Sequence, residues 1–275
     1  MTEQRWLTKI LLNIFLCILI GIMVELILVE PPAIAQTITA QTNPQWGYQG
    51  KTKPEKWGNL SSNYRTCRKG VQQSPIDIDQ PLAPRILQPK LEYQSIPLKF
   101  LNTGNTIQIN ANSDNKLVID DQIFELVQIH FHNPSEHQIK GKAYPMEAHF
   151  VHKNQSGKLL VLAVFIKSGQ ENIALQPIWD LIPSASKTET NTSKVSLKLT
   201  DLIPENKQNY QYIGSLTTPP CTEGVQWVLL AEPIELSQPQ INQFQAIFPV
   251  NARPCLLYTS PSPRDLSTSR MPSSA

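Results

Sequence analysis

The alternation of apolar and polar residues predicts that this chain folds mainly into β-strands. Residues 124–132 (FELVQIHFH) and 146–152 (MEAHFVH) alternate and are rich in β-branched and aromatic side chains, a pattern typical of strands with one face in a core. Residues 158–167 (KLLVLAVFIK) form a nearly continuous apolar run, which predicts a central strand. A polar stretch with Gly141 and Pro145 separates the first two segments, so we expect them to pair antiparallel.

Two segments follow the helical period instead. Residues 173–182 and 237–248 are predicted to be helices, and Ser237 is the expected N-cap of the second. The apolar face of this second helix is formed by Ile241, Phe244 and Phe248. The chain shows no internal repeat, and about 210 residues alternate short strands with turns marked by proline and glycine, enough for a sizeable core in one β-rich domain.

The first 35 residues carry the pattern of a secretory signal. Two basic residues precede an apolar stretch at 10–29, and the small residues Ala33-Ile-Ala35 follow it as a cleavage pattern. The apolar stretch approaches the roughly 20 residues that span a bilayer, so an uncleaved membrane anchor stays open beside cleavage after Ala35. In either case residues 1–35 predict export, to the periplasm or the extracellular space, and residues 36–45 form a polar linker.

The charge of the chain excludes one class of partner. The net charge is +2 at pH 7, with 24 basic and 22 acidic residues, and the lysines are scattered rather than gathered in a stripe. Nucleic acid is therefore not an expected partner, because the sequence lacks the basic footprint of a polyanion site.

The candidate chemistry lies in the histidines, all five of which fall within 23 residues. His130 and His132 point to the same face of their strand because successive side chains alternate. If the following strand pairs with it, His149 completes a set of three nitrogen ligands, the number that a catalytic zinc site offers while it keeps one position for water. No fourth His or Cys stands at ligand spacing, and we expect His137 and His152 to be ordinary hydrogen-bonded residues.

Two further residues support a metal site. Gln128 lies two positions before His130, and Glu147 lies two positions before His149, on the same strand faces. Each is placed to bond the other ring nitrogen of its neighbour and so to fix the tautomer that binds the ion.

Five sequence blocks, in order, resemble the α-class carbonic anhydrases over residues 46–254. They are Gln73-Ser-Pro-Ile-Asp-Ile78, Gln128-Ile-His-Phe-His132, Pro134-Ser-Glu-His137, Glu147-Ala-His-Phe-Val-His152 and Gly214-Ser-Leu-Thr-Thr-Pro-Pro220. The resemblance implies a mainly β (β-rich α+β) catalytic domain around a large, twisted, mostly antiparallel sheet with a few short surface helices. It also implies one Zn2+ per chain, held by His130, His132 and His149, and reversible hydration of carbon dioxide to bicarbonate and a proton by attack of zinc hydroxide.

The resemblance implies further roles around the ion. Thr217 is the hydroxyl beside the zinc-bound solvent, and Glu136 accepts its proton. The backbone carbonyl of Asn251 accepts a hydrogen bond from His132, and the other partners of the ligands are Gln128 and Glu147. The substrate lies against Val151, Val161, Leu216, Thr218, Val225 and Trp227. Anionic and sulfonamide-type inhibitors are expected on the same ground.

The chain departs from the family at Asn102-Thr-Gly-Asn105. Efficient members carry a histidine at the position of Asn105, and this histidine passes the product proton to solvent. Asparagine orders water but does not titrate near pH 7, and no histidine lies outside residues 130–152 to replace it. We therefore expect slow, buffer-dependent proton release, limited to roughly 10³ to 10⁴ per second against the ~10⁶ per second known for carbonic anhydrase.

Two other functions fit parts of the sequence. The spacing His130-x-His132-x3-Glu136 also fits the first motif of cupin metalloenzymes, in which the glutamate binds iron or manganese for oxygen chemistry. Against it, no glycine stands at the cupin spacing after Glu136. A non-catalytic binding module of the anhydrase fold is the second alternative, although such members lack the zinc ligands that are all present here.

Two of the four cysteines are expected to form a disulfide. Cys17 lies in the predicted signal and Cys255 in the tail, which leaves Cys67 and Cys221 in the domain. An exported domain with two cysteines suggests a bond, with two separate thiols as the alternative. The resemblance favours the bond, because related secreted members join the equivalent positions.

Residues 255–275 are rich in serine and proline and resemble translated adapter from sequencing libraries. We expect a non-native tail without ordered structure, the alternative being a natural Ser/Pro-rich tail. The family continues after Asn251-Ala-Arg-Pro254 with a further strand that does not follow here, so we expect a truncated gene product.

Overall fold

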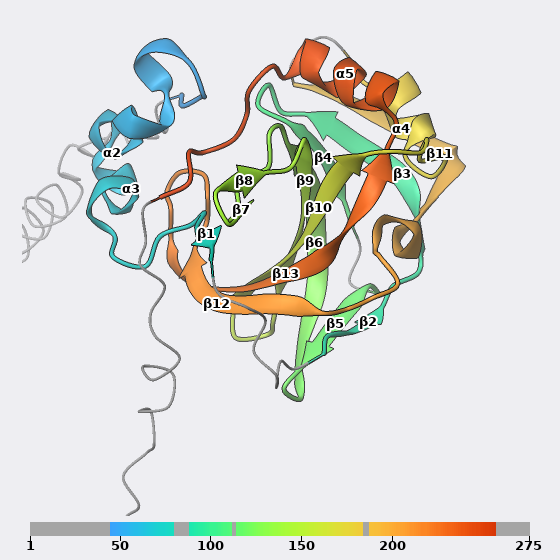
Figure 1. Cartoon of the computed structure of the whole chain (residues 1–275), viewed down its shortest axis with the longest axis horizontal. Helices are drawn as coiled ribbons and strands as arrows, with labels where there is room; N and C mark the ends of the chain where they lie inside the picture. The colour runs from blue at the N-terminus through green and yellow to red at the C-terminus, as the bar shows by residue number, and fades with distance from the viewer. Residues whose placement is uncertain (1–44, 80–87, 112–113, 184–186, 257–275) are drawn as a thin grey trace, which may run out of the picture. The chain divides into compact units, whose positions relative to one another are not determined.

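Strands dominate the fold, as the alternation of residues predicts (Figure 1). The computed structural model describes residues 45–79, 88–111, 114–183 and 187–256, which all belong to one structural unit. The predicted signal, nearly all of the predicted linker and most of the predicted tail lie outside the described residues. Within the described part, no helix is both long enough and apolar enough to cross a membrane.

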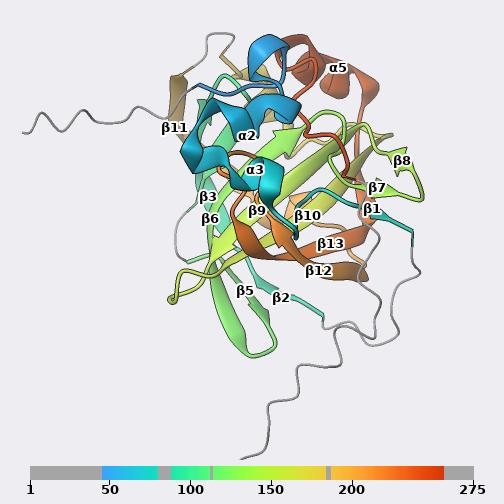
Figure 2. The ribbon, with the colours of Figure 1, turned by 90° about the vertical axis from the view of Figure 1, so that its left-hand side faces the viewer.

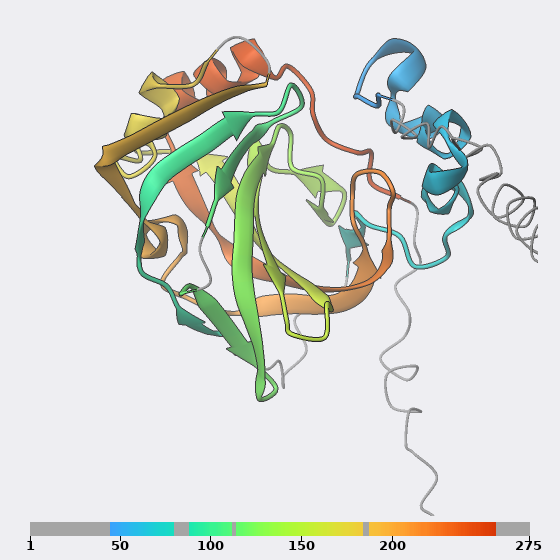
Figure 3. The same ribbon diagram turned by 180° about the vertical axis from the view of Figure 1, so that it is seen from behind.

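One large, curved sheet contains ten of the strands (Figure 3). These strands are β2 (Lys90–Glu92), β3 (Ser95–Asn102), β4 (Ile107–Asn110), β5 (Lys116–Ile119), β6 (Gln122–His132), β9 (Met146–Lys153), β10 (Leu159–Ser168), β11 (Thr188–Lys198), β12 (Asn209–Ser215) and β13 (Glu223–Leu236). Their order is β11-β3-β4-β6-β9-β10-β13-β12, and β5 pairs with both β2 and β6 beside this path. Among the described strands of this sheet, only β10 and β13 run parallel, so the predicted mostly antiparallel arrangement is confirmed.

A smaller sheet and several short helices complete the fold. The smaller sheet joins β1 (Asp77–Ile78), β7 (Gln138–Ile139) and β8 (Lys142–Ala143). The helices are η1 (Gly50–Thr52), η2 (Pro54–Lys56), α2 (Trp57–Leu60), η3 (Ser62–Tyr64), α3 (Thr66–Lys69), α4 (Gln176–Asp180), η4 (Leu199–Leu202) and α5 (Gln238–Ile247). Figure 2 shows the domain from the side that carries α2 and α3.

The pairing of β6, β9 and β10 confirms the three strands predicted from the sequence. β9 runs antiparallel to both of its neighbours, with His149 opposite His130 on β6 and opposite Ala163 on β10. This register is favoured because one residue of slippage would turn every apolar side chain of β9 to the wrong face.

The two predicted helices differ in how well they match the structure. α5 begins after Ser237, which forms the predicted N-cap within a capping box with Gln240. The predicted helix at 173–182 is wrong in length, since only α4, Gln176–Asp180, is helical. Pro177 explains the difference, because its nitrogen has no hydrogen to donate to the carbonyl four residues earlier.

Each central strand divides its side chains between two apolar clusters. On β10, Leu160, Leu162 and Val164 enter a large core that α4 and α5 help to close, whereas Val161 and Ala163 enter a smaller cluster on the other face. The smaller cluster also contains side chains from β13, and the predicted metal ligands of β6 and β9 share its face of the sheet. The alternation along each strand therefore separates the stabilising core from the candidate site.

The first two residues of the predicted tail differ from the expectation that residues 255–275 lack ordered structure. The Leu256 N–H donates to the Pro75 carbonyl at 3.1 Å, and Leu256 pairs in parallel with Ile76. Cys255 and Leu256 are therefore ordered, contrary to the prediction for residues 255–275, because the backbone next to β1 offers a free carbonyl. The remaining tail lies outside the described residues.

Candidate metal centre

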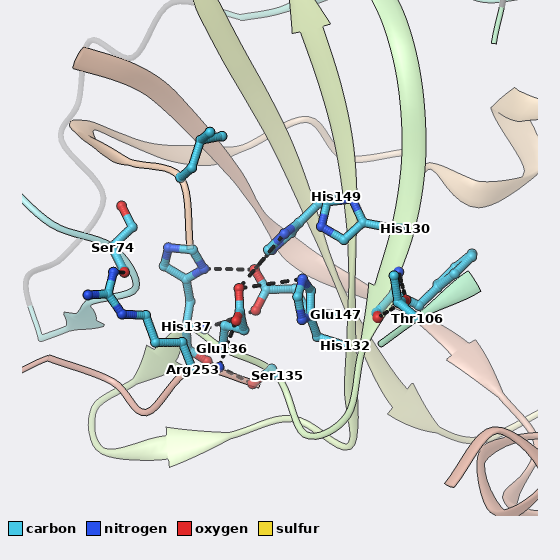
Figure 4. Close-up of polar contacts among 12 residues, drawn as sticks. Ser74, Thr106, His130, His132, Ser135, Glu136, His137, Glu147, His149 and Arg253 are labelled. Carbon is cyan, nitrogen blue, oxygen red and sulfur yellow. Dashed lines mark hydrogen bonds and ion pairs between the residues drawn. The ribbon is translucent and has the colours of Figure 1, made fainter. Parts of the chain in front are cut away.

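Three histidine rings converge where β6 and β9 lie side by side (Figure 4). His130, His132 and His149 each offer one ring nitrogen, and these three atoms lie within 4.8 Å of one another. His132 and His149 are each only 1% exposed. The sequence prediction of a three-nitrogen set is thus confirmed by the geometry.

The second nitrogen of each ring is held by a hydrogen bond. Gln128 Oε1 lies 3.0 Å from His130 Nδ1, and Glu147 Oε1 lies 2.8 Å from His149 Nε2. The Asn251 carbonyl accepts from His132 Nδ1 at 2.7 Å. All three predicted contacts are present, and they leave Nε2 of His130 and His132 and Nδ1 of His149 as the nitrogens that face one another.

The electrostatics favour the neutral form of two of these ligands, His130 and His132. Desolvation lowers the pKa of His130 well below its ordinary value, and the neighbouring rings of His132 and His149 lower it further. Burial also lowers the pKa of His132, with Glu136 and the Asn251 carbonyl acting in the opposite direction. A metal needs the lone pair of a neutral imidazole, so both shifts favour binding at neutral pH.

One ligand atom is buried without a hydrogen-bond partner among the described residues. His132 Nε2 makes no hydrogen bond in the described part of the chain, although a buried polar atom in a folded protein almost always has a partner. A cation bound by the three nitrogens would satisfy it. Three imidazoles in a closed, partly apolar setting match the ligand preference of zinc, so the residues present fit that ion.

Glu136 lies beside this orphan atom. Its Oε2 is 3.5 Å from His132 Nε2 and also lacks a hydrogen-bond partner among the described residues, while its Oε1 accepts from the Arg253 N–H at 2.7 Å. The Arg253 guanidinium donates in turn to the carbonyls of Cys67 and Ser74. Sequence reasoning missed Arg253, because no local pattern shows that an arginine near the C-terminus will be buried behind the site.

His137 and His152 are hydrogen-bonded, as predicted, and both are buried. His137 Nδ1 lies 2.7 Å from Glu147 Oε1, and His152 Nε2 lies 2.7 Å from the Tyr93 hydroxyl. Burial alone would raise the pKa of Glu147, but His137 and His149 outweigh it and hold this pKa well below its usual range. Glu147 is therefore a carboxylate shared by two imidazoles.

The loop that joins β12 to β13 carries Thr217, which is 4% exposed. Cys221 in the same loop forms the predicted disulfide with Cys67, with the two Cα atoms 5.0 Å apart. The Cys221 carbonyl also accepts from Gln73 Nε2 at 3.0 Å. No hydrogen bond joins Thr217 to Glu136 Oε2 in this structure, since that oxygen has no partner in the described chain.

The residues expected to form the apolar wall lie together. Trp227 packs its ring 5.0 Å from that of His149, which places the wall against a metal ligand. The other members share one apolar cluster, with Val151 and Leu216 at its partly buried edge and Val161 and Val225 inside it. Thr218 is partly buried in the loop that follows Leu216.

Asn105 lies in the turn between β3 and β4 and lines a pocket together with Trp46 and Tyr48. The Asn251 amide donates to the Asn105 carbonyl at 2.8 Å, while the Asn251 carbonyl holds His132. The turn with Asn105 and one metal ligand are therefore fixed by the same residue.

The fold and the site together define a metalloenzyme with three histidine ligands for zinc on a large β-sheet. The family described as eukaryotic-type carbonic anhydrase matches residues 52–257. A carbonic anhydrase of Nostoc sp. is 39% identical over 231 residues, which cover 82% of this chain and 85% of that protein. A carbonic anhydrase of Neisseria gonorrhoeae is 41% identical, covering 76% of this chain and 83% of that protein.

A solved structure agrees with these sequence matches. The α-carbonic anhydrase of Thermovibrio ammonificans, in complex with the inhibitor sulfanilamide, superposes with a TM-score of 0.76 at 39% identity and covers 78% of this chain and 96% of that one. The chain belongs to the α-class carbonic anhydrases and is a carbonic anhydrase by its family and relatives. The cupin interpretation is thereby rejected.

Proposed function

We propose that this protein hydrates carbon dioxide reversibly at one zinc ion per chain and releases the product proton slowly. The proposal depends mainly on one observation: three imidazole nitrogens converge within 4.8 Å, and each ring is fixed by a hydrogen bond from its other nitrogen. A zinc ion held there supplies the charge that makes water acidic enough to lose a proton near pH 7, as carbonic anhydrases are known to do.

Thr217 and Glu136 orient the attacking oxygen in this proposal. The Thr217 hydroxyl donates to Glu136, which leaves the Thr217 oxygen free only to accept. A buried Glu136 Oε2 without a partner supports this assignment, because that atom needs a donor. The Arg253 N–H occupies Oε1, so Oε2 is the oxygen left for Thr217.

The substrate binds against the apolar side of the site. Carbon dioxide is small and carries no net charge, so it gains from apolar contact beside the ion. Val161, Val225 and Trp227 are each at most 2% exposed, and the partly buried Val151 and Leu216 extend the same cluster. Thr218 follows on the loop and completes the substrate contacts.

Asn105 limits the release of the proton. No imidazole of the chain lies outside residues 130–152, and Asn105 stands at the shuttle position implied by the family. Protons then leave to water or to dissolved buffer, which makes turnover depend on buffer concentration.

The partners and the location complete the proposal. An aromatic sulfonamide is expected to inhibit this protein, as sulfanilamide is named as an inhibitor of the Thermovibrio ammonificans relative. The Cys67–Cys221 disulfide supports an oxidising location such as the periplasm or the extracellular space. A catalytic domain at 46–254 after a signal at 1–35, with a non-native tail, remains part of this proposal.

The decisive experiment measures zinc content and carbon dioxide hydration together. In His149→Ala, two ligands neither hold the ion tightly nor enforce a tetrahedral site, so stoichiometric zinc and essentially all activity should be lost. His152→Gln is the matched control, because it removes an imidazole from the same strand on the opposite face. Full activity in His149→Ala, or bound iron in the wild type, would contradict the proposal.

A further inference from the structure

A threonine directly before β4 holds the residue that lies between two of the metal ligands. Phe131 stands between His130 and His132 on β6. The Thr106 hydroxyl donates to the Phe131 carbonyl at 2.6 Å and accepts from the Phe131 N–H at 3.2 Å (Figure 4). One hydroxyl therefore serves both backbone groups of Phe131, although the proposed reaction does not use it.

The hydroxyl extends the sheet at the point where backbone pairing ends. β4 pairs with β6 from Asn110 opposite Gln128 to Gln108 opposite His130. Phe131 comes next on β6 and is 0% exposed, so its backbone groups need partners inside the protein. The side chain of Thr106 supplies a partner to each of them.

These two bonds restrain the backbone that joins the ligands. The Phe131 N–H belongs to the planar peptide group shared with His130, and the Phe131 carbonyl belongs to the peptide group shared with His132. Only the two backbone torsions of Phe131 separate these planes. A hydroxyl bonded to both planes therefore restrains these torsions and, with them, the relative direction of the two imidazoles.

Other contacts hold Thr106 and Phe131 themselves in place. The Thr106 N–H donates to Thr103 Oγ1 at 3.1 Å, and the Thr106 carbonyl accepts from the Thr103 N–H at 2.9 Å. On the core face of β6, the Phe131 ring packs edge-on against Trp179, with the ring centres 5.4 Å apart. Asn251 Nδ2 donates to the same Phe131 carbonyl at 2.9 Å, since a carbonyl oxygen accepts two bonds. The turn before β4 and the core thus fix the two residues that the hydroxyl joins.

We propose that Thr106 is a positioning residue for zinc, acting through the Phe131 backbone on the ligands His130 and His132. Its hydroxyl keeps the two rings in the arrangement of this structure, with their centres 4.9 Å apart and their ligand nitrogens within 4.8 Å of each other. Ligands that are already arranged bind an ion more tightly than ligands that must be ordered on binding. The inference rests on the proposed function only in that the site must bind zinc.

The test compares the zinc affinity of three variants, measured by competition with a chelator. Thr106→Val has nearly the shape of the threonine but lacks its hydroxyl, so we expect roughly tenfold weaker binding. Thr106→Ser keeps the hydroxyl and should bind zinc within about twofold of the wild type. Thr52→Val is the matched control and should leave zinc affinity unchanged, because the Thr52 hydroxyl donates to the backbone carbonyl of Gln49 in the N-terminal segment.

Ring-nitrogen NMR spectra separate positioning from a general loss of stability. In the zinc-bound protein, the signals of His130 and His132 should move in Thr106→Val and return to their wild-type positions in Thr106→Ser. The signals of His152, which lies on the core face of β9, should stay in place in both variants.

Thr106→Ala removes the same hydroxyl and takes the place of Thr106→Val if the valine variant does not fold. Equal zinc affinity with and without the hydroxyl, unmoved signals of His130 and His132, or a serine variant that binds as weakly as the valine variant would overturn the inference. A wild type that binds no zinc would instead overturn the proposed function itself.

Discussion

The buried His152 makes the stability of this protein depend on pH in a predictable way. Its side chain is 0% exposed, and Nδ1 has no hydrogen-bond partner in the described part of the chain. Burial lowers the pKa of His152 to about 3, although the backbone carbonyls of Phe150 and Leu160 act in the opposite direction. The Tyr93 hydroxyl satisfies Nε2 without adding charge. The folded protein therefore holds this imidazole neutral.

The magnitude follows from the difference between the two pKa values of His152. In the unfolded chain a histidine titrates near pH 6.5. Below that pH the unfolded chain binds a proton at His152 that the folded protein does not bind. The contribution of the neutral His152 to the free energy of unfolding is therefore complete above pH 6.5 and is lost as the pH falls toward 3. At 1.36 kcal/mol per pKa unit, the loss at pH 5 is about 2 kcal/mol.

The assay is urea unfolding of the metal-free protein at pH 7.5 and pH 5.0. His152→Gln no longer titrates, so its free energy of unfolding should fall between these two pH values by about 2 kcal/mol less than that of the wild type. Losses from the other titrating groups are common to both proteins and cancel in the comparison. Tyr93→Phe keeps the imidazole and should keep the wild-type dependence. An equal fall in His152→Gln and wild type would refute the reasoning.

Three further predictions concern the turn, the disulfide and the C-terminal end. Asn105→His should raise kcat in dilute buffer at least about tenfold and leave kcat/KM within about twofold, and imidazole should raise kcat of the wild type more than that of the variant. Replacing both Cys67 and Cys221 by serine opens a loop of sequence separation 154, which should lower the free energy of unfolding by up to about 5 kcal/mol in urea titrations. Truncation after Leu256 should leave the melting temperature unchanged, whereas truncation after Pro254 should lower stability by about 1 kcal/mol through the lost Leu256–Pro75 hydrogen bond.

The ligand set is the part of this protein that sequence pattern predicts best. His130 and His132 share a strand face through the period of two, and His149 reaches them because a short connection pairs β9 with β6. The same periodicity places Gln128 and Glu147 beside their partners. All of these contacts depend on local alternation and on one antiparallel register.

Residues that contact the site from segments distant in the sequence could not be predicted from the alternation along one strand. Asn251 was found only through the family resemblance, and Arg253 and Tyr212 were not found at all. Arg253 reaches Cys67 across 186 positions, and Tyr212 reaches His137 across 75. Their contacts depend on how the sheet curves and on which loops cover it, and neither is encoded in the period of a single strand. The helix predicted at 173–182 was wrong for a local reason. Pro177 limits the helix to Gln176–Asp180, and the apolar pattern of the segment did not show this.

β9 shows why chemistry and stability can be probed separately in this fold. His149 and His152 are three positions apart, so the alternation of the strand turns them to opposite faces. The Nδ1 atom of His149 faces the ring nitrogens of His130 and His132. The His152 ring instead stacks on Tyr93 within the large apolar core. Burial favours the neutral form of both His130 and His152. On the face of the sheet that carries the metal site, the His130 ring lies beside the two other ligand imidazoles, His132 and His149. A substitution at His152 should therefore change the pH dependence of unfolding without changing zinc stoichiometry, and one at His149 should remove zinc.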